Sequence, residues 1–297
     1  MLRTEVERIL IENGRAIGVR LEGGREVRAD IVVSNADPGV TWGRLVPSEH
    51  IGWLLRRRIA HMHFSVSTLS LFMAVDMDLR AAGLDSGNVW FSRTADVDAS
   101  YEYAERQTLT GQEEIAGVFF NATTLKDPTM RRDGLHTVEA MALSSVDPFA
   151  RWKDLPPGKR GPDYQRLKAD LTERILDAVD CFVPGLRERT VFRALGTPLT
   201  NVRFLHATRG GIYGTEKTLG NLGPFSFSVE SDIPGLFQCG ASTIAPGING
   251  VTHSGISAAA AALGCGADEL LTATGQELRI YPAEDPASWP KELRTGP

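Results

Sequence analysis

A run of glycines near the end of the chain has the spacing of a cofactor-binding loop. Residues 233–263 read IPGLFQCGASTIAPGINGVTHSGISAAAAAL, which predicts a short apolar strand at 235–239, a loop and an alanine-rich helix. The N-terminus of a helix presents unpaired backbone N–H groups and a positive dipole end, so it attracts an anionic or electron-rich ligand. Four glycines leave room for a flat group against the backbone, namely Gly240, Gly247, Gly250 and Gly255.

A second glycine-rich segment, 196–214, reads GTPLTNVRFLHATRGGIYG and mixes turn-forming residues with aromatic ones. Loops of this composition line ligands more often than they fill cores, because binding residues collect on surface loops. Phe204 and Tyr213 would face the ligand, and Gly210 and Gly211 would let the backbone approach something planar. A compact surface loop without a ligand is the alternative explanation.

The elements that must position these loops begin with residues 4–38. Apolar residues alternate along 6–11 and 17–21 with glycines between the runs, which predicts antiparallel strands joined by hairpin turns. The run Ile31–Val33 predicts a strand covered on both faces, as in parallel sheets. Such a meander usually adjoins a parallel nucleotide-binding sheet, whose first strand leads into a G-x-G-x-x-G turn. The sequence contains no such turn, so the predicted sheet lacks its usual first unit.

Residues 62–145 contain several short runs of alternating apolar and polar side chains, which predicts a mostly antiparallel sheet. An apolar face of that sheet would be either the wall of a hydrophobic pocket or an ordinary core face. A proline-rich stretch, 148–162, precedes residues 163–182, whose apolar side chains recur at helical spacing. We therefore expect a second domain built from a sheet with helices.

Composition excludes several classes of protein. The 297 residues carry a net charge of −5, so no basic field favours nucleic acid. The three cysteines lack CxxC spacing, which argues against disulfides and zinc and favours a reducing cytoplasm. His61 and His63 share a strand face without a third ligand nearby, so we expect no metal site. With no signal sequence and no apolar run of transmembrane length, we expect a soluble, cytoplasmic chain.

One predicted helix, at 48–60, has features of a membrane-surface helix. Trp53, Leu54 and Leu55 precede Arg56–Arg58, an arrangement typical of helices that lie on lipid. A surface helix with a solvated arginine face is the commoner alternative. The sequence therefore leaves peripheral membrane contact open.

A set of motifs in fixed order resembles one family. The motifs are ADIVVSNADP at 29–38, DPTMRRDGLHTVEAMA at 127–142, GTPLTN and RGGIYG within 196–214, and IPGLFQCGAST, PGINGV and SG within 233–255. Together they resemble the C-terminal half of phytoene desaturase-type flavoproteins, a family that includes carotenoid isomerases and retinol saturases. The similarity runs from residue 4 to about residue 272.

The resemblance implies an α/β fold with α+β character. It implies an incomplete FAD/NAD(P)-binding Rossmann-like domain, discontinuous in sequence, beside a mostly antiparallel substrate-binding domain with helices. Residues 1–40 and 190–272 would form the cofactor domain, 41–189 the substrate domain, and 273–297 a C-terminal tail.

The resemblance also implies a set of cofactor contacts, with FAD as the cofactor. Positions matching Gly240 and Ala241 lie by the FAD pyrophosphate and ribityl chain, and Val6 matches a position whose backbone contacts the adenine. The loop matching Gly247, Asn249, Gly250 and Val251 lies by the pyrimidine edge of the flavin, where N–H groups stabilise negative charge on the reduced ring. The stretch facing flavin and substrate matches Phe204, Gly210, Gly211 and Tyr213.

The catalytic groups are not named by the resemblance. His253 is the titratable side chain nearest to the expected flavin, and a structural role for it is the alternative. An acidic residue often found where Ala241 stands is absent. Flavin chemistry on hydrocarbons needs no strong side-chain base, because the cofactor carries the difficult step.

The implied function is hydride transfer between a flavin and a polyene or isoprenoid lipid, whether as desaturation, saturation or isomerisation. A flavin amine oxidase-like enzyme for a small polar substrate is one alternative. A non-catalytic or split subunit, which needs a separate N-terminal FAD-binding segment, is another, because the ADP half of FAD lacks its usual site without the G-x-G-x-x-G unit. The absence of G-x-S-x-G argues against a hydrolase.

Overall fold

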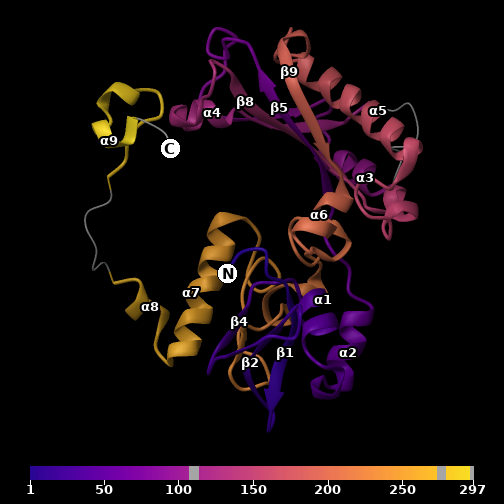
Figure 1. The fold of residues 1–297 in the computed structure, drawn as a ribbon, viewed down its shortest axis with the longest axis vertical. Helices are drawn as coiled ribbons and strands as arrows, with labels where there is room; N and C mark the ends of the chain where they lie inside the picture. Colours follow the sequence, from indigo (N-terminus) through magenta and orange to yellow (C-terminus); the bar gives the residue numbers. More distant parts are fainter. Residues whose placement is uncertain (107–113, 273–278, 295–297) are drawn as a thin grey trace. The chain divides into compact units, whose positions relative to one another are not determined.

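The computed structural model describes residues 1–106, 114–272 and 279–294 (Figure 1). The chain forms two compact units, and each is described by itself. The first unit comprises residues 1–65 and 202–275, and the second comprises 66–201 and 276–297.

These units differ in extent from the expected domains. Residues 41–65 group with the first unit, because Trp42, Leu45 and Val46 are buried in its core. The expected tail at 273–297 lies partly outside the described residues, and its described part groups with the second unit. That a unit is compact does not show that it binds a substrate. The substrate role expected for residues 41–189 therefore stays a prediction.

The first unit contains two small sheets, one antiparallel and one parallel. The antiparallel meander is the one expected from the sequence, and Gly14 supplies the positive φ of its first hairpin. The parallel pair joins segments two hundred residues apart, with Val33 opposite Phe237. The strands are β1 (Val6–Glu12), β2 (Arg15–Leu21) and β3 (Glu26–Arg28) in the meander, and β4 (Val32–Ser34) with β10 (Leu236–Gln238) in the parallel pair.

One sequence-based expectation about β4 is wrong. Ile31 and Val33 are 41% and 49% exposed, so the β-branched run is not covered on both faces. Val32 alone packs against the core of the first unit. The parallel sheet has only two strands within the described residues, whereas parallel sheets are normally buried on both faces.

The helices of the first unit are α1 (Pro38–Val40), α2 (Trp53–Ala60), α7 (Gly247–Leu263) and α8 (Ala267–Leu270). Helix α7 ends where Gly264 adopts a left-handed conformation, as helices commonly do. The helix expected at 48–60 is interrupted, because Ile51 is extended and buried between a 3-10 turn and α2. Helix α6 (Pro198–Phe204) contains the boundary between the units.

The second unit is built on a five-stranded antiparallel sheet, which confirms the expected fold class of an α/β chain with a mostly antiparallel sheet. Strand β5 lies between β8 and β9, with Leu71 opposite Ala140 on one side and Leu195 on the other. In sheet order the strands are β6 (Asn88–Ser92), β7 (Gly117–Asn121), β8 (His136–Ser144), β5 (Ser67–Val75) and β9 (Thr190–Gly196).

One face of this sheet forms the core of the second unit. Helix α5 (Gly161–Asp180) covers it with Leu171, Ile175 and Val179, which are fully buried against the strands (Figure 1). Apolar side chains at every second position of β5 complete the core, as the alternation of a strand requires. The other described helices of this unit are α3 (Val97–Arg106), α4 (Thr123–Lys126) and α9 (Lys291–Arg294).

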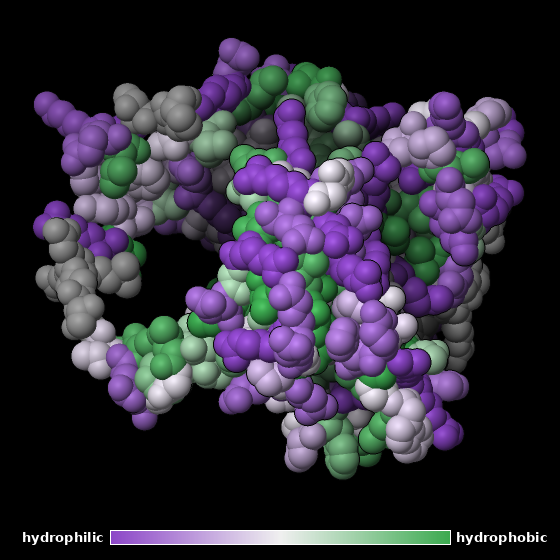
Figure 2. Space-filling model, turned by 60° about the horizontal axis from the view of Figure 1, so that its bottom comes forward, coloured by the Kyte–Doolittle hydropathy of each residue, from purple (hydrophilic) through white to green (hydrophobic). Residues whose placement is uncertain are grey.

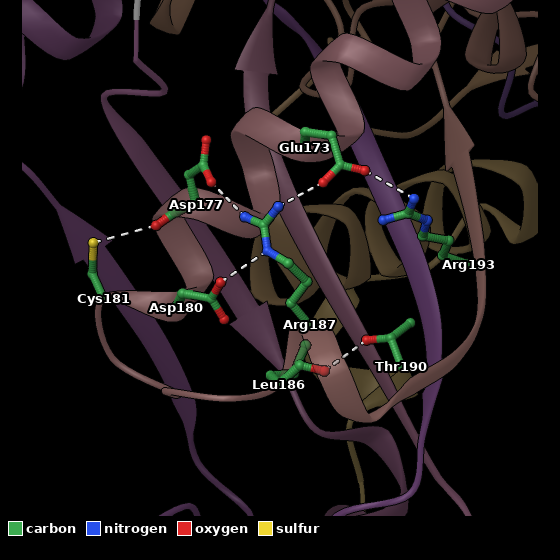
Figure 3. A network of polar contacts seen from close by, with 8 residues as sticks. All are labelled: Glu173, Asp177, Asp180, Cys181, Leu186, Arg187, Thr190 and Arg193. Atoms are coloured by element: carbon green, nitrogen blue, oxygen red, sulfur yellow. Dashed lines mark hydrogen bonds and ion pairs between the residues drawn. The ribbon is translucent and has the colours of Figure 1, made fainter.

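An arginine network fixes the connection between α5 and β9 (Figure 3). Arg187 donates to Glu173 at 2.6 Å and to Asp180 at 3.1 Å, and it also pairs with Asp177. Arg193 on β9 reaches the second oxygen of Glu173 at 2.8 Å. A single exposed pair stabilises little, but several charges sharing one guanidinium hold the turn before β9 in place.

Candidate cofactor site

The site begins where β10 ends. Gly240 has φ +108°, and a Cβ there would lie 2.6 Å from the side-chain oxygen of Asn35, so only glycine fits. Its backbone N–H donates to Ser254 Oγ at 2.8 Å, and its carbonyl accepts from Thr243 Oγ1 at 2.7 Å. The two hydroxyls lie 2.5 Å apart. This buried cycle fixes the loop after β10 against α7.

The N-terminus of α7 is open. Its N-cap is Pro246, so no side chain caps the first turn. Gly247 and Gly255 have no atom within 4 Å of an added Cβ. Ile248, on the first turn, is 85% exposed, and Val251 is also exposed. The helix therefore presents backbone N–H groups beside open space with apolar side chains around them.

Asp37 joins the end of β4 to the second glycine-rich segment. Its carboxylate accepts from the N–H of Val40 at 3.0 Å, which caps α1, and from the N–H of Thr208 at 2.6 Å. The Thr208 hydroxyl also donates to it, at 2.7 Å. The packing is close, because a Cβ on Gly39 would press on Thr208 and Phe64.

Ser242 joins the segment after Tyr213 to the loop after β10. Its hydroxyl oxygen accepts from the N–H of Thr215 at 3.0 Å, and Gly214 lies so close that a Cβ would collide with it. Lys217 Nζ donates to the carbonyl of Ala241 at 2.6 Å, and burial lowers the pKa of this ammonium. Three segments distant in sequence thus meet around 240–243.

The expected site residues differ in how deeply the structure buries them. Gly240 and Ala241 lie in the buried loop, and the N–H of Tyr213 donates to Ser65 Oγ at 2.8 Å, beside Gly211. Phe204 is exposed. Val6 opens β1, and its neighbour Glu5 lies 3.9 Å from His206.

The surroundings of His253 and Gly250 bear on two further expectations, which stay predictions. His253 is exposed on α7, one residue before the buried Ser254. Gly250 is packed against the chain itself, since a Cβ would collide with the Ala245 carbonyl. A bulky residue at 250 would therefore disturb the loop even without any ligand.

Several residues that build the site were missed from the sequence. In the sequence Asp37 indicates only a turn, yet its carboxylate accepts a hydrogen bond from the N–H of Thr208, which is 171 positions later in the chain. Ser242 and Ser254 belong to the motifs, but small hydroxyl residues carry no signal of which N–H they accept. Lys217 is one lysine among many polar residues. The proximity of Ser242 and Ser254 to glycines with unusual backbone was the available clue.

These residues fit the flavin half of an FAD molecule. An uncapped helix N-terminus suits an electron-rich ring edge, and the open positions at Gly247 and Gly255 suit a flat group. The ADP half has no comparable site in the described residues, whose parallel sheet contains two strands. Within these residues no group of three or more His, Cys, Asp or Glu could hold a metal ion.

Residues 1–263 match the family described as flavin containing amine oxidoreductase. The chain belongs to this family. The match confirms the expected class of FAD-dependent oxidoreductase and its flavin cofactor. None of the helices in the described ranges is long and apolar enough to cross a membrane.

Curated relatives carry names from the expected group. The chain is 28% identical over 291 residues to the all-trans-retinol 13,14-reductase of Rattus norvegicus, covering 94% of this chain and 48% of the relative. It is 28% identical over 263 residues to the chloroplastic prolycopene isomerase of Arabidopsis thaliana, covering 86% and 40%. The chain thus spans about half the length of the curated relatives it matches, or less.

Solved structures share the fold. Putrescine oxidase bound to putrescine aligns with a TM-score of 0.56 at 15% identity, over 89% of this chain and 49% of that one. An oxidoreductase from Methanosarcina mazei aligns with a TM-score of 0.52 at 18% identity, over 86% and 48%. Likeness at this identity supports the fold alone.

Proposed function

We propose that this chain forms the flavin-facing part of an FAD-dependent oxidoreductase that acts on a polyene or other isoprenoid lipid. The family match and the open N-terminus of α7 support the cofactor. The names of the rat and Arabidopsis relatives support a retinoid or carotenoid substrate.

When bound, the flavin would supply the acceptor or donor of a hydride. The residues of this chain would orient the ring and control its charge. The N–H groups of the first turn of α7 would stabilise negative charge at the ring edge. Ile248 and Val251 would exclude water from that edge, and the hydroxyl cycle of Gly240, Thr243 and Ser254 would hold the loop rigid.

The observation that carries the substrate class is the second face of the sheet in the second unit. Trp90, Phe119 and Met141 are cross-strand neighbours on β6, β7 and β8, and they face away from the buried core. Phe72 and Phe192 add exposed aromatic side chains on β5 and β9 to the same face, where Glu139 lies opposite Phe72 and Ser70 lies opposite Met141. Antiparallel sheets usually present polar residues on their second face. The aromatic and aliphatic side chains on this face would suit a hydrocarbon chain.

An amine substrate is the alternative within the same family. An amine site usually needs aromatic rings that enclose a cation. In the second unit, the rings of Trp90 and Phe119 meet edge to face, with centroids 4.8 Å apart. Two rings in this arrangement do not form a cage around a cation. This geometry favours the polyene.

We also propose that a separate N-terminal FAD-binding segment completes the site. The exposed side chains of Ile31 and Val33 support this, because further strands and helices cover such residues in parallel sheets. Without that segment the chain would be a non-catalytic subunit.

Peripheral membrane contact through α2 is part of the proposal. Trp53 and Leu54 are 73% and 66% exposed, and Figure 2 shows hydrophobic residues reaching the surface between hydrophilic ones on the face that it draws. The arginines are not equivalent. Arg56 donates to Ile51 O at 2.9 Å, and Arg58 binds the Phe225 carbonyl and lies 3.9 Å from the centre of the Phe227 ring. Arg57 is exposed and is therefore the charge available to anionic lipid.

Titration of the purified chain with all-trans-retinol and with putrescine tests the substrate class. Retinol fluorescence should rise with a saturable curve, while putrescine at the same concentrations should give no calorimetric signal. Binding of putrescine without binding of retinol would favour the amine alternative. Failure to bind either ligand would argue against a substrate site in this chain.

A further inference from the structure

A cavity of about 760 Å³ opens in the second unit, at the end of the sheet where β5 stops. Its walls come from the turn after β5, from α4, from the start of β8 and from the turn before β9. Val75 at this end pairs with His136 and with Thr190. The cavity shares no residue with the loop after β10, which belongs to the first unit.

The cavity lies far from the place where the chain enters the sheet. Strand β5 begins at Ser67, next to the unit boundary, and runs eight residue steps to Val75. At about 3.3 Å a residue the strand spans roughly 26 Å. The site therefore differs from the apolar sheet face proposed for a polyene, because it is an end of the sheet and is lined by charged groups.

A buried histidine lines the cavity. His136 is only 6% exposed, and its Nδ1 lies 2.8 Å from the hydroxyl of Thr124. That hydroxyl oxygen also accepts from the N–H of Thr137 at 3.1 Å. Either tautomer leaves one donor without a partner here: the Thr124 hydrogen when the ring N–H is on Nδ1, or the Nε2–H when Thr124 donates to Nδ1. In the second tautomer Nε2, to which the described residues give no partner, is a donor for a ligand in the cavity.

Charged side chains of both signs surround this histidine, and guanidinium and carboxylate groups are equal in number once Glu284 is counted. Arg80, Arg131 and Arg189 line the cavity together with Asp76 and Asp78. One carboxylate is already in use, since Asp78 accepts the backbone N–H groups of Arg80 at 3.1 Å and of Ala81 at 3.0 Å. Glu284 also lies near Arg80, and its negative charge partly offsets the positive charge of the Arg80 guanidinium.

Two of the arginines remain for a ligand. Arg131 donates through Nε and Nη2 to the Gly134 carbonyl, which holds the guanidinium in position and leaves Nη1. Arg189 follows directly on the network of Arg187 and its three carboxylates, so its backbone is fixed (Figure 3). The Arg189 carbonyl accepts from the N–H of Asp76 at 2.8 Å, which ties the turn to the end of β5.

We propose that this cavity binds a small molecule through a carboxylate or phosphate group, with His136, Arg131 and Arg189 as the donors. Guanidinium groups pair with either oxyanion in a planar, two-pronged geometry. A neutral imidazole N–H at the base adds a directed hydrogen bond. Buried polar groups normally have hydrogen-bond partners. A ligand oxygen in the cavity would give the buried ring of His136 that partner.

Isothermal titration calorimetry of the full chain tests the proposal in two arms, one with inorganic phosphate and one with succinate. At least one anion should give a saturable isotherm, and the arm that binds identifies the class of oxyanion. Arg189→Gln and Arg131→Gln should each weaken that binding about tenfold, the effect of one lost charged hydrogen bond. Arg166→Gln is the matched control, because Arg166 pairs with Asp163 on α5 and does not line the cavity.

Two results would overturn the proposal. One is the absence of saturation by either anion up to about 20 mM, a weaker affinity than a built site gives. The other is equal binding by wild type and both cavity variants, which would mean that the anion binds elsewhere. An independent readout is the imidazole proton resonance of His136, which should shift on addition of the binding anion and stay unchanged with sodium chloride at equal ionic strength.

Discussion

The backbone N–H of Gly240 donates a hydrogen bond to Ser254 Oγ at 2.8 Å, which links the end of β10 to α7. Because Thr243 Oγ1 donates to the Gly240 carbonyl, the Ser254 hydrogen points to Thr243, and the three residues close a cycle. All the groups in it are buried. The chain therefore shapes the loop of the proposed flavin site with its own hydroxyls.

Ser254→Ala tests this cycle. The variant leaves the buried N–H of Gly240 without an acceptor, which costs about 1–3 kcal/mol. Urea unfolding should show that loss of stability, with an unchanged slope. Ser257→Ala on the same helix is the matched control and should change stability by less than about 0.5 kcal/mol, because no hydrogen bond of its hydroxyl occurs in the described residues. Equal stability of the two variants would show that the cycle does not hold the loop.

Phe192→Asp tests the apolar face of the sheet. Phe192 is exposed on β9 and lies opposite Ala74 on the face away from the core. A carboxylate there should weaken retinol binding about tenfold or more, since burial of a phenylalanine side chain contributes about 1.5–3 kcal/mol. Val97→Asp is the control, because Val97 is equally exposed but lies on α3 and not on the sheet. If both variants bind retinol as wild type does, the polyene binds elsewhere.

Trp53→Ser combined with Leu54→Ser tests membrane contact. The variant should lose sedimentation with vesicles that contain phosphatidylserine, because two exposed apolar anchors are removed. Arg57→Glu should weaken binding mainly at low salt, since its effect is electrostatic. Trp90→Ser, which removes an equally exposed tryptophan from the second unit, should sediment like wild type. Sedimentation that is insensitive to α2 would argue against this surface.

The stability of the chain should depend on pH through His136. Burial, with a smaller effect of Arg131, lowers the pKa of this imidazole below its ordinary value. The unfolded chain then binds the proton more readily than the folded one, so stability is full above the ordinary pKa of about 6.5 and falls as pH decreases toward the folded pKa. Urea midpoints between about pH 8 and pH 5 should fall less steeply in His136→Gln. Identical slopes would mean that His136 does not titrate differently on folding.

The sequence predicted the meander, a short strand at 235–239 and an amphipathic helix at 163–182, because each has a strong period or turn signal. In the structure these two are β10 at Leu236–Gln238 and α5 at Gly161–Asp180. It also predicted the glycine loop, since glycines at 240 and 247 mark a backbone that other residues avoid. The same reasoning failed for Ile31 and Val33, whose β-branched run indicates burial. Their exposure depends on how many strands the sheet has, which no local pattern records.

Long-range hydrogen bonds were beyond prediction for a similar reason. The contacts of Asp37 with Thr208 and of Ser242 with Thr215 depend on backbone positions set by the whole fold. The cavity around His136 is a further example. Its walls come from segments more than a hundred residues apart, and although the motif at 127–142 contains Arg131 and His136, nothing in its pattern indicates that Arg189 lies beside them.

The most direct test of the central claim, that the loop after β10 and the first turn of α7 face the flavin, is photolabelling with an FAD analogue that carries an azide at C2, on the pyrimidine edge of the flavin, followed by peptide mapping. The account predicts that the label concentrates on residues 240–251 and that excess FAD removes it. Ile248→Asp should reduce labelling while the helix stays folded, because a carboxylate at a helix N-terminus stabilises the helix by about 0.5 kcal/mol but repels the electron-rich carbonyl edge of the ring. Ile248→Lys should retain the label. Label that is spread evenly over both units, or that excess FAD does not displace, would contradict the account.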